Sequence, residues 1–362
     1  MGVVGPAEGQ GLRLEGRVLR VSGTDSVPLP NAWVVLHEVT MDGGGPRDSV
    51  PTGRDGAYRI GVAAPDTTAL YMVSTTYLGL AYFSQVRTAR TTDGPLDPLV
   101  VFDTSSTGSA IAVAQRHIII RDAEESNRRS VLELVALAND GDRTRIAGEP
   151  PHPTWVGRLP AGATNFVVGQ GDVSAEAVQL VGDSIVVTAP IPPGVKQLVF
   201  TYEMPGGREL RLPVDQPAER LLVLLADTGA VVTDGPLMRR GVEVFDDTQF
   251  ALFSGAAPNA GDVMVFEFNA RRFAPGMAPA LIAGVAAVLL LLAIPLLRRR
   301  SPEAVRAAPP TTPELLARAI AVLDAEHERG PRTAAGDAAY GARRSALKAQ
   351  LADLLARGRG GA

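Results

Sequence analysis

A run of twenty residues without a charged or strongly hydrogen-bonding side chain, Ala278–Leu297, constrains this chain more than any other feature. At about 1.5 Å per residue a helix of that length spans ~30 Å, the thickness of a bilayer's hydrocarbon core. Three arginines follow at once, Arg298, Arg299 and Arg300, and they suit a membrane boundary better than the end of a core helix. Residues 277–297 are therefore predicted to form one transmembrane helix. The alternative is a buried helix of a globular core.

The charges on the two sides of this run predict its orientation. From Arg298 onward the chain has 12 Lys+Arg and 7 Asp+Glu, whereas the preceding part has 23 basic and 32 acidic residues. Basic residues flank membrane spans on the cytoplasmic side, so the tail is predicted to be cytoplasmic and residues 1–270 extracytoplasmic. Arg271 and Arg272, on the other flank, oppose this orientation. The net charge of −4 argues against nucleic acid as a partner.

Export of residues 1–270 requires a signal, and the start of this sequence does not supply a complete one. It has neither a basic region nor an apolar stretch of seven residues. Residues 1–11 are interpreted as the remnant of a signal or as a disordered start. The expectation is a start site further upstream or a cleaved signal.

Residues 12–103 have the alternating strand and turn segments of a small antiparallel β-domain. Short runs rich in β-branched residues alternate with turn clusters. In residues 33–38, Trp33, Val35 and His37 alternate with the other three side chains, the period of two expected of a strand with one buried face.

This segment also carries the motifs of a known family. They are Gly16-x-Val18, then Pro30-x-Ala32-x-Val34-x-Leu36, then Thr52-x-x-Asp55-Gly56-x-Tyr58. The pattern resembles the carboxypeptidase regulatory-like domain, a transthyretin-like β-sandwich related to the B-repeats of surface adhesins. The resemblance implies a recognition or spacer module rather than a peptidase. The chain contains no zinc-peptidase His-x-x-Glu pattern.

After a serine- and glycine-containing linker at 104–112, residues 113–270 are predicted to form a second β-sandwich, with a division into two small sandwiches as the alternative. A hairpin turn is expected at Asn139–Asp142 and a polar turn at Asp246-Asp247. The predicted strands are Arg116–Arg121, Val131–Ala138, Asn165–Val168, Asp183–Thr188, Gln197–Tyr202, Glu209–Leu212, Arg220–Leu225, Val242–Phe245 and Val263–Asn269.

The last part of the chain is predicted to be a proline-containing linker at 298–313 and a helical hairpin at 314–356. Thr312 and Pro313 mark the start of a helix, and leucines recur at three-to-four spacing on both sides of Gly330-Pro331. The stretch Tyr340–Lys348 is similar to short helical hairpins of bacterial membrane proteins, including proteins linked to cytochrome c maturation. A hairpin that packs on itself and one that docks a partner remain alternatives.

No constellation for catalysis or metal binding is found. The chain has no cysteine, and its histidines, His37, His117, His152 and His327, have no metal-ligand spacing. No nucleophile elbow, phosphate loop or dinucleotide fingerprint occurs. The prediction is therefore a non-enzyme with no catalytic residues, no metal, no cofactor and no small-molecule substrate.

The resulting expectation is a mainly β protein of the bacterial inner membrane with two or three sandwiches, one span and a helical tail. Its predicted role is an accessory or stabilising subunit of a larger membrane complex, such as an electron-transport assembly. The alternatives are an envelope or cytochrome c biogenesis factor and an exported hydrolase. Gly284 and Ala287 are candidate helix-packing positions, since small side chains allow close approach of another helix. Alternatively, they face lipid.

Overall fold

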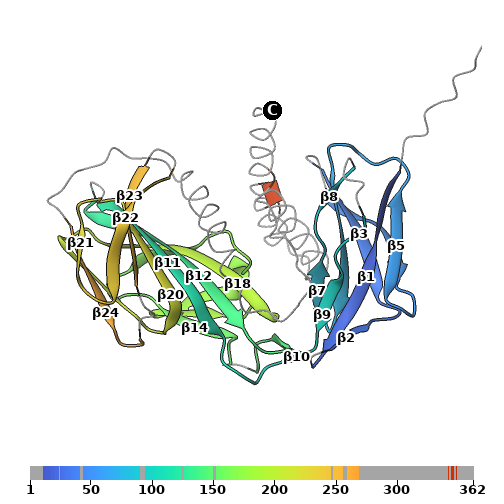
Figure 1. Ribbon diagram of the computed structural model, residues 1–362, viewed down its shortest axis with the longest axis horizontal. Coiled ribbons are helices and arrows are strands. Elements are labelled where there is room, and N and C mark those ends of the chain that lie inside the picture. The colour runs from blue at the N-terminus through green and yellow to red at the C-terminus, as the bar shows by residue number, and fades with distance from the viewer. Residues whose placement is uncertain are drawn as a thin grey trace, which may run out of the picture. The chain divides into compact units, whose positions relative to one another are not determined.

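The computed structural model describes residues 11–23, 25–40, 44–89, 94–123, 126–149, 152–245, 248–255 and 259–268, together with Gly341, Arg344, Ser345 and Lys348. In this part of the chain nearly every regular element is a strand, which confirms the prediction of a mainly β protein. The strands form two compact units, unit 1 up to Asp103 and unit 2 from Thr104 (Figure 1).

The first sheet of unit 1 has four strands: β1 (Leu12–Ser22), β2 (Asp25–Pro28), β5 (Ala57–Val62) and β9 (Leu99–Phe102). The first half of β1 pairs antiparallel with β5. Its second half pairs antiparallel with β2 and parallel with β9, starting at Val18 opposite Leu99. The long strand β1 therefore joins the beginning of unit 1 to its end.

The second sheet of unit 1 is antiparallel, with the order β4-β3-β6-β7 and a short strand, β8, beside β6. Its strands are β3 (Trp33–Val39), β4 (Gly44–Pro51), β6 (Leu70–Tyr77), β7 (Leu80–Phe83) and β8 (Arg87–Thr88). Val34 and Leu36 of β3 are fully buried, whereas Trp33 is 61% exposed. The predicted alternation is confirmed from Trp33 to Leu36 and ends at His37, which is also buried and where the pairing with β4 shifts register.

The buried side chains of both sheets meet in one cluster, so unit 1 is a β-sandwich. The members are Leu12, Leu14, Val18, Val34, Leu36, Tyr58, Ile60, Ala69, Tyr71, Val73, Leu96, Leu99 and Val101. The chain crosses from one sheet to the other through a turn at Asp55-Gly56. Gly56 has a φ of +73°, and a Cβ atom there would lie 2.5 Å from the carbonyl oxygen of Val18. This turn therefore requires glycine.

Unit 2 is built on a seven-stranded sheet with the order β15-β18-β12-β11-β20-β23-β22. All neighbours are antiparallel except β11 and β20, which are parallel. The strands are β11 (Ala112–Ala123), β12 (Arg128–Asn139), β15 (Thr164–Val168), β18 (Gly194–Pro205), β20 (Ala218–Leu225), β22 (Leu237–Phe245) and β23 (Thr248–Gly255).

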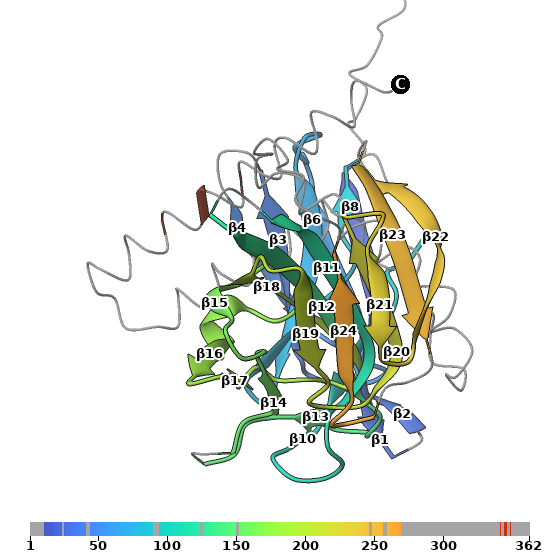
Figure 2. The ribbon, with the colours of Figure 1, turned by 90° about the vertical axis from the view of Figure 1, so that its left-hand side faces the viewer.

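Two three-stranded sheets pack on one face of this large sheet (Figure 2). The first, in the order β14-β17-β16, contains β14 (Trp155–Arg158), β16 (Val178–Val181) and β17 (Ser184–Val187). The second, in the order β19-β24-β21, contains β19 (Glu209–Pro213), β21 (Val231–Asp234) and β24 (Val263–Glu267). A short parallel pair, β10 (Thr104–Ser105) with β13 (Thr144–Arg145), and a 3-10 turn, η1 (Ala175–Ala177), complete the described elements of unit 2.

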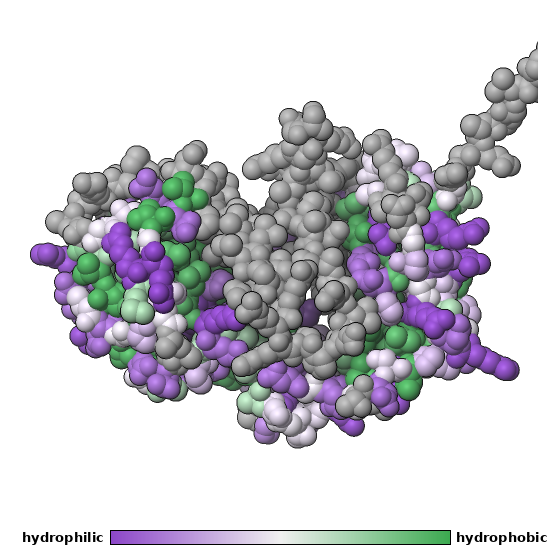
Figure 3. Space-filling view, in the orientation of Figure 1, coloured by the Kyte–Doolittle hydropathy of each residue, from purple (hydrophilic) through white to green (hydrophobic). Residues whose placement is uncertain are grey.

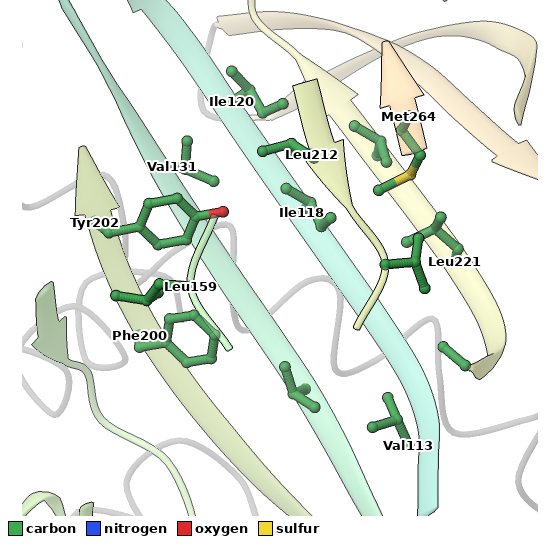
Figure 4. Packing of buried hydrophobic residues seen from close by; sticks show 14 of the residues in the cluster. Val113, Ile118, Ile120, Val131, Leu159, Phe200, Tyr202, Leu212, Leu221 and Met264 are labelled. Atoms are coloured by element: carbon green, nitrogen blue, oxygen red, sulfur yellow. The ribbon is translucent and has the colours of Figure 1, made fainter. Parts of the chain in front are cut away.

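A single buried cluster connects the large sheet to both small sheets. Figure 4 shows Ile118 and Ile120 of β11 close to Leu212 of β19, and Phe200 of β18 beside Leu159; these residues and Met264 of β24 belong to the same cluster. Among the described residues of unit 2, the large sheet and both small sheets therefore share one core. The opposite face of the large sheet carries a second, smaller cluster: Ile119, Leu132, Leu134, Val199, Leu224 and Phe250.

The strands predicted for unit 2 all occur, but the two-residue strands β10 and β13 were not predicted, nor were four longer strands, β14, β16, β21 and β23. Three of them have only four residues, too few for a clear period of two. The fourth, β23, reads Thr-Gln-Phe-Ala-Leu-Phe-Ser-Gly and contains one β-branched residue. Pairing with β20 and β22, rather than local propensity, makes it a strand.

The prediction of a hairpin turn at Asn139–Asp142 is wrong. The strand that follows, β13, pairs with β10 and not with β12. The side chain of Asn139 accepts a hydrogen bond from the Gly141 N–H at 3.0 Å and donates to the carbonyl of Ile191 at 2.7 Å. These bonds fix a turn that leads the chain away from β12. Thr104 and Ser105, in the segment predicted as a linker, belong to a strand of unit 2.

No helix among the described residues is long and apolar enough to cross a membrane. The predicted span 277–297, with Gly284 and Ala287, lies outside the described residues, as do Arg298, Arg299 and Arg300. Of the predicted helical hairpin 314–356, the structure describes Gly341, Arg344, Ser345 and Lys348, which are helical.

Candidate functional site

The most unusual chemistry in the described residues is a buried ion pair in the core of unit 2. Arg116 lies on β11 and Glu133 on the neighbouring β12, and both side chains point to the face that the small sheets cover. Arg116 Nε donates to Glu133 Oε2 at 2.6 Å and Nη2 donates to Oε1 at 3.1 Å. The Glu133 side chain is 1% exposed and that of Arg116 9%. A planar, two-bond geometry of this kind is the strongest form of a side-chain ion pair.

Two further side chains complete what we call the polar cluster: Arg116, Glu133, Tyr202 and Asp215. Tyr202 of β18 donates its hydroxyl hydrogen to Glu133 Oε1 at 2.6 Å. Figure 4 shows this hydroxyl directed from β18 over the neighbouring strand. Asp215, in the loop between β19 and β20, accepts a long hydrogen bond from Arg116 Nη1 at 3.5 Å. The cluster thus ties three adjacent strands to a loop from another part of unit 2.

The protonation states of the polar cluster follow from its burial and its charges. Burial by itself would lower the pKa of Arg116, but the charge and hydrogen bonds of Glu133 outweigh it and raise that pKa. Burial, followed by the charge of Glu133, raises the pKa of Tyr202 well above its usual value. Arg116 therefore remains a cation and Tyr202 a neutral donor at physiological pH.

The loop that carries Asp215 is held by β14. Asp215 Oδ2 accepts the backbone N–H of Arg158 at 2.8 Å, and Gln216 Oε1 accepts the Trp155 indole N–H at 3.0 Å. Gln216 also donates to the carbonyl of Val156. These contacts extend the hydrogen-bond network from the polar cluster to the edge of a small sheet.

Beside the polar cluster is a cavity of ≈ 20 Å³, lined among others by Arg116, Glu133, Trp155 and Gln216. About one water molecule fits a space of this size. The cavity is too small for a substrate, and each ionised group is used in an internal bond. The arrangement can fix the register of β11, β12 and β18, which is the best-attested use of buried ion pairs.

Sequence analysis missed this cluster, although a signal was present. On β12, Glu133 points to the same face as Val131 and Val135, which is the core face. On β11, Arg116 points to the same core face as Ile118 and Ile120. Two opposite charges at core-facing positions of adjacent apolar strands indicate a buried pair.

Unit 1 has a more open hollow of ≈ 400 Å³ beside β1, lined among others by Gly16, Tyr58, Arg17 and Arg59. Tyr58 packs so closely on Gly16 that a Cβ atom there would lie 2.6 Å from the tyrosine hydroxyl oxygen. That hydroxyl is buried and has no hydrogen-bond partner among the described residues, and burial raises the pKa of Tyr58. Both arginines are paired, Arg59 with Glu15 at 2.9 Å and Arg17 with Asp55 at 3.7 Å. The hollow therefore offers no uncompensated charge to a ligand.

His37 belongs to unit 1, His117 and His152 belong to unit 2, and His327 is outside the described residues. The His37 ring on β3 is hydrogen-bonded to Ser74 Oγ on β6 at 2.8 Å. The ring of exposed His152 is hydrogen-bonded to the carbonyl of Glu149 at 2.9 Å. His117, on β11, pairs with Leu134 and Leu222, and burial lowers its pKa to about 4. Among the described residues no group of three His, Asp or Glu side chains could hold a metal ion.

No protein-family model matches this chain, and no curated protein is significantly similar to it.

Proposed function

We propose that this chain is a membrane-anchored, cofactor-free structural or binding subunit whose two β units stand outside the cytoplasm as part of a larger membrane complex. The observation that carries the proposal is the apolar run Ala278–Leu297 followed by Arg298, Arg299 and Arg300. A span of this kind anchors a protein almost irreversibly, which a merely exported module does not require. The resemblance of residues 12–103 to carboxypeptidase regulatory-like domains supports a recognition or spacer role for unit 1.

The chemistry of the described residues supports a structural role rather than a catalytic one. The polar cluster is enclosed and internally satisfied, so it stabilises unit 2 instead of reaching a substrate. In unit 1, close packing of Tyr58 on Gly16 and the Asp55-Gly56 turn support the assignment of the resembling motifs to structural positions. Such motifs specify the fold of the unit, and the exposed side chains determine which partner it binds.

Membrane topology tests the anchor. A reporter fused after Leu355 should be active in the cytoplasm, and one fused after Gly255 should be active outside it. A chain in which Arg298, Arg299 and Arg300 are all replaced by alanine serves as the control, because it should show a weakened orientation bias. Cytoplasmic activity of the Gly255 fusion would refute the proposal. Purification of the full chain in mild detergent, with identification of co-purifying proteins, then tests membership in a complex.

A further inference from the structure

Among the described strands, β22 lies at one edge of the large sheet. It is terminal in the strand order, and the described residues give it one pairing partner, β23 (Figure 2). All residues from Met238 to Val244 are exposed, including Val242 at 45% and Val244 at 60%. Figure 3 shows hydrophobic and hydrophilic side chains next to each other on this side of unit 2. Edge strands with free backbone groups are templates for pairing with another strand.

A β-bulge disrupts strand pairing at one end of the β22 edge but not at the other. The register shifts between Arg239 and Gly241, where Gly241 has a φ of +156°, and such a bulge disrupts pairing locally. Beyond it, Gly241–Val244 pair regularly with β23 and contain neither proline nor an inward-pointing charge. The opposite edge, β15, is less suitable because its pairing with β18 shifts register between Thr164 and Val167.

We propose that β22 pairs antiparallel with β22 of a second copy of this chain, around a two-fold axis at Val242. Residues opposite each other in an antiparallel pair must point to the same face. Gly241 and Glu243 share the face of Leu252 and Phe250, whereas Val242 and Val244 share the face of Ala251. An axis at Val242 satisfies this condition, placing Gly241 opposite Glu243 and Val242 opposite itself. An axis at Glu243 would bring two carboxylates together, which is unfavourable.

Charge complementarity favours a second copy over an unrelated peptide. Arg240 Nε donates to Ser254 Oγ at 2.9 Å, which places the guanidinium on the face that also carries Glu243. Glu243 has no ion pair among the described residues. In the proposed register Glu243 of one copy lies opposite Gly241 of the other, so the Arg240 guanidinium next to Gly241 can pair with it, and the symmetry forms this ion pair twice. The two Glu243 carboxylates lie diagonally across from each other, and each has an arginine of the other copy on its outer side. The exposed valines, Val242 and Val244, add an apolar strip on the opposite face of the paired strands.

The absence of cysteine makes a sharp test possible. Val242→Cys introduces one thiol, and residues directly opposite in an antiparallel pair have Cα atoms about 4.5–5.5 Å apart, within disulfide range. The matched control is Val231→Cys on β21, since Val231 is 48% exposed. In membranes that contain the full chain, mild oxidation should cross-link Val242→Cys at least about tenfold faster than the control, because pairing raises the effective thiol concentration.

Charge exchange provides a second, independent readout. Arg240→Glu and Glu243→Arg should each reduce the dimer fraction of the full chain in detergent, and the double variant should restore it. Equal cross-linking rates for Val242→Cys and Val231→Cys would overturn the proposal. So would protection of the Val242→Cys thiol from alkylation without any cross-linked dimer, because a different partner would then occupy the edge.

Discussion

Removing the carboxylate of the polar cluster should be among the most destabilising single changes in unit 2. Glu133→Gln keeps the shape of the side chain but leaves Arg116, 9% exposed, with Asp215 at 3.5 Å as its remaining counter-charge. Breaking one partner of a buried pair costs about 3–5 kcal/mol. Tyr202→Phe removes one hydrogen bond to a charged group but keeps the ion pair, so it should cost about 1.5–3 kcal/mol.

The reasoning also predicts a rescue. The triple variant Arg116→Met, Glu133→Leu, Tyr202→Phe removes the three polar groups that these strands contribute to the polar cluster, while keeping approximate volume. Well-packed apolar replacements of buried ion pairs are often neutral or stabilising. The triple variant should therefore be more stable than Glu133→Gln by about 2 kcal/mol or more, since it leaves no uncompensated charge in the core.

The assay uses one intrinsic reporter. Trp155 lines the cavity beside the polar cluster and is one of two tryptophans in the chain; Trp33 is the other. In a Trp33→Phe background, urea unfolding of the full chain in detergent, followed by fluorescence, reports the stability of unit 2. A loss below about 1 kcal/mol for Glu133→Gln, or a triple variant no more stable than Glu133→Gln, would refute the claim of a buried, charged pair.

Other features give further predictions. The pKa of His117 falls from its usual 6.5 to about 4 in the folded chain, so the unfolded state binds the proton first as pH falls. Between pH 7.5 and 5 His117 should therefore account for a stability loss of about 2 kcal/mol, which His117→Leu should abolish in the same urea assay; identical losses in both proteins would contradict this. Gly56→Ala should destabilise unit 1 by about 3 kcal/mol, because the Cβ meets the Val18 carbonyl at 2.5 Å. The control is Gly23→Ala: Gly23 has a φ of +63°, and a Cβ atom there would have no atom within 4 Å, so this change should cost only about 1 kcal/mol. Hydrogen exchange of the β1 and β5 amides measures the stability loss of each variant, and equal losses would argue against the clash at Gly56.

How much the sequence reveals depends on whether a feature is local. The strand at Trp33–Val39 and the turn at Asp55-Gly56 could be predicted, because a period of two and a glycine turn are visible within a few residues. The partner of each strand could not, as β13 shows: the turn before it looks like a hairpin, yet its partner is β10. The core-facing positions of Arg116 and Glu133 are visible in the sequence, but their contacts in the polar cluster are not. Arg116, Glu133 and Asp215 become neighbours only through the pairing of strands and the folding back of a distant loop.

The parallel pairings of β1 with β9 and of β11 with β20 also determine when the chain can fold. Parallel neighbours are joined by long crossovers, so each unit is completed only after its later strands have been synthesised. During synthesis β1 can pair with β2 and β5 but lacks its parallel neighbour until Leu99–Phe102 is made, and β11 can pair with β12 but lacks its parallel neighbour until Ala218–Leu225 is made. The exposed intermediate carries apolar strands with free edges, which are prone to aggregate. Unit 1 can be completed once Phe102 has been synthesised, whereas the large sheet of unit 2 lacks its parallel strand until Ala218–Leu225 is available.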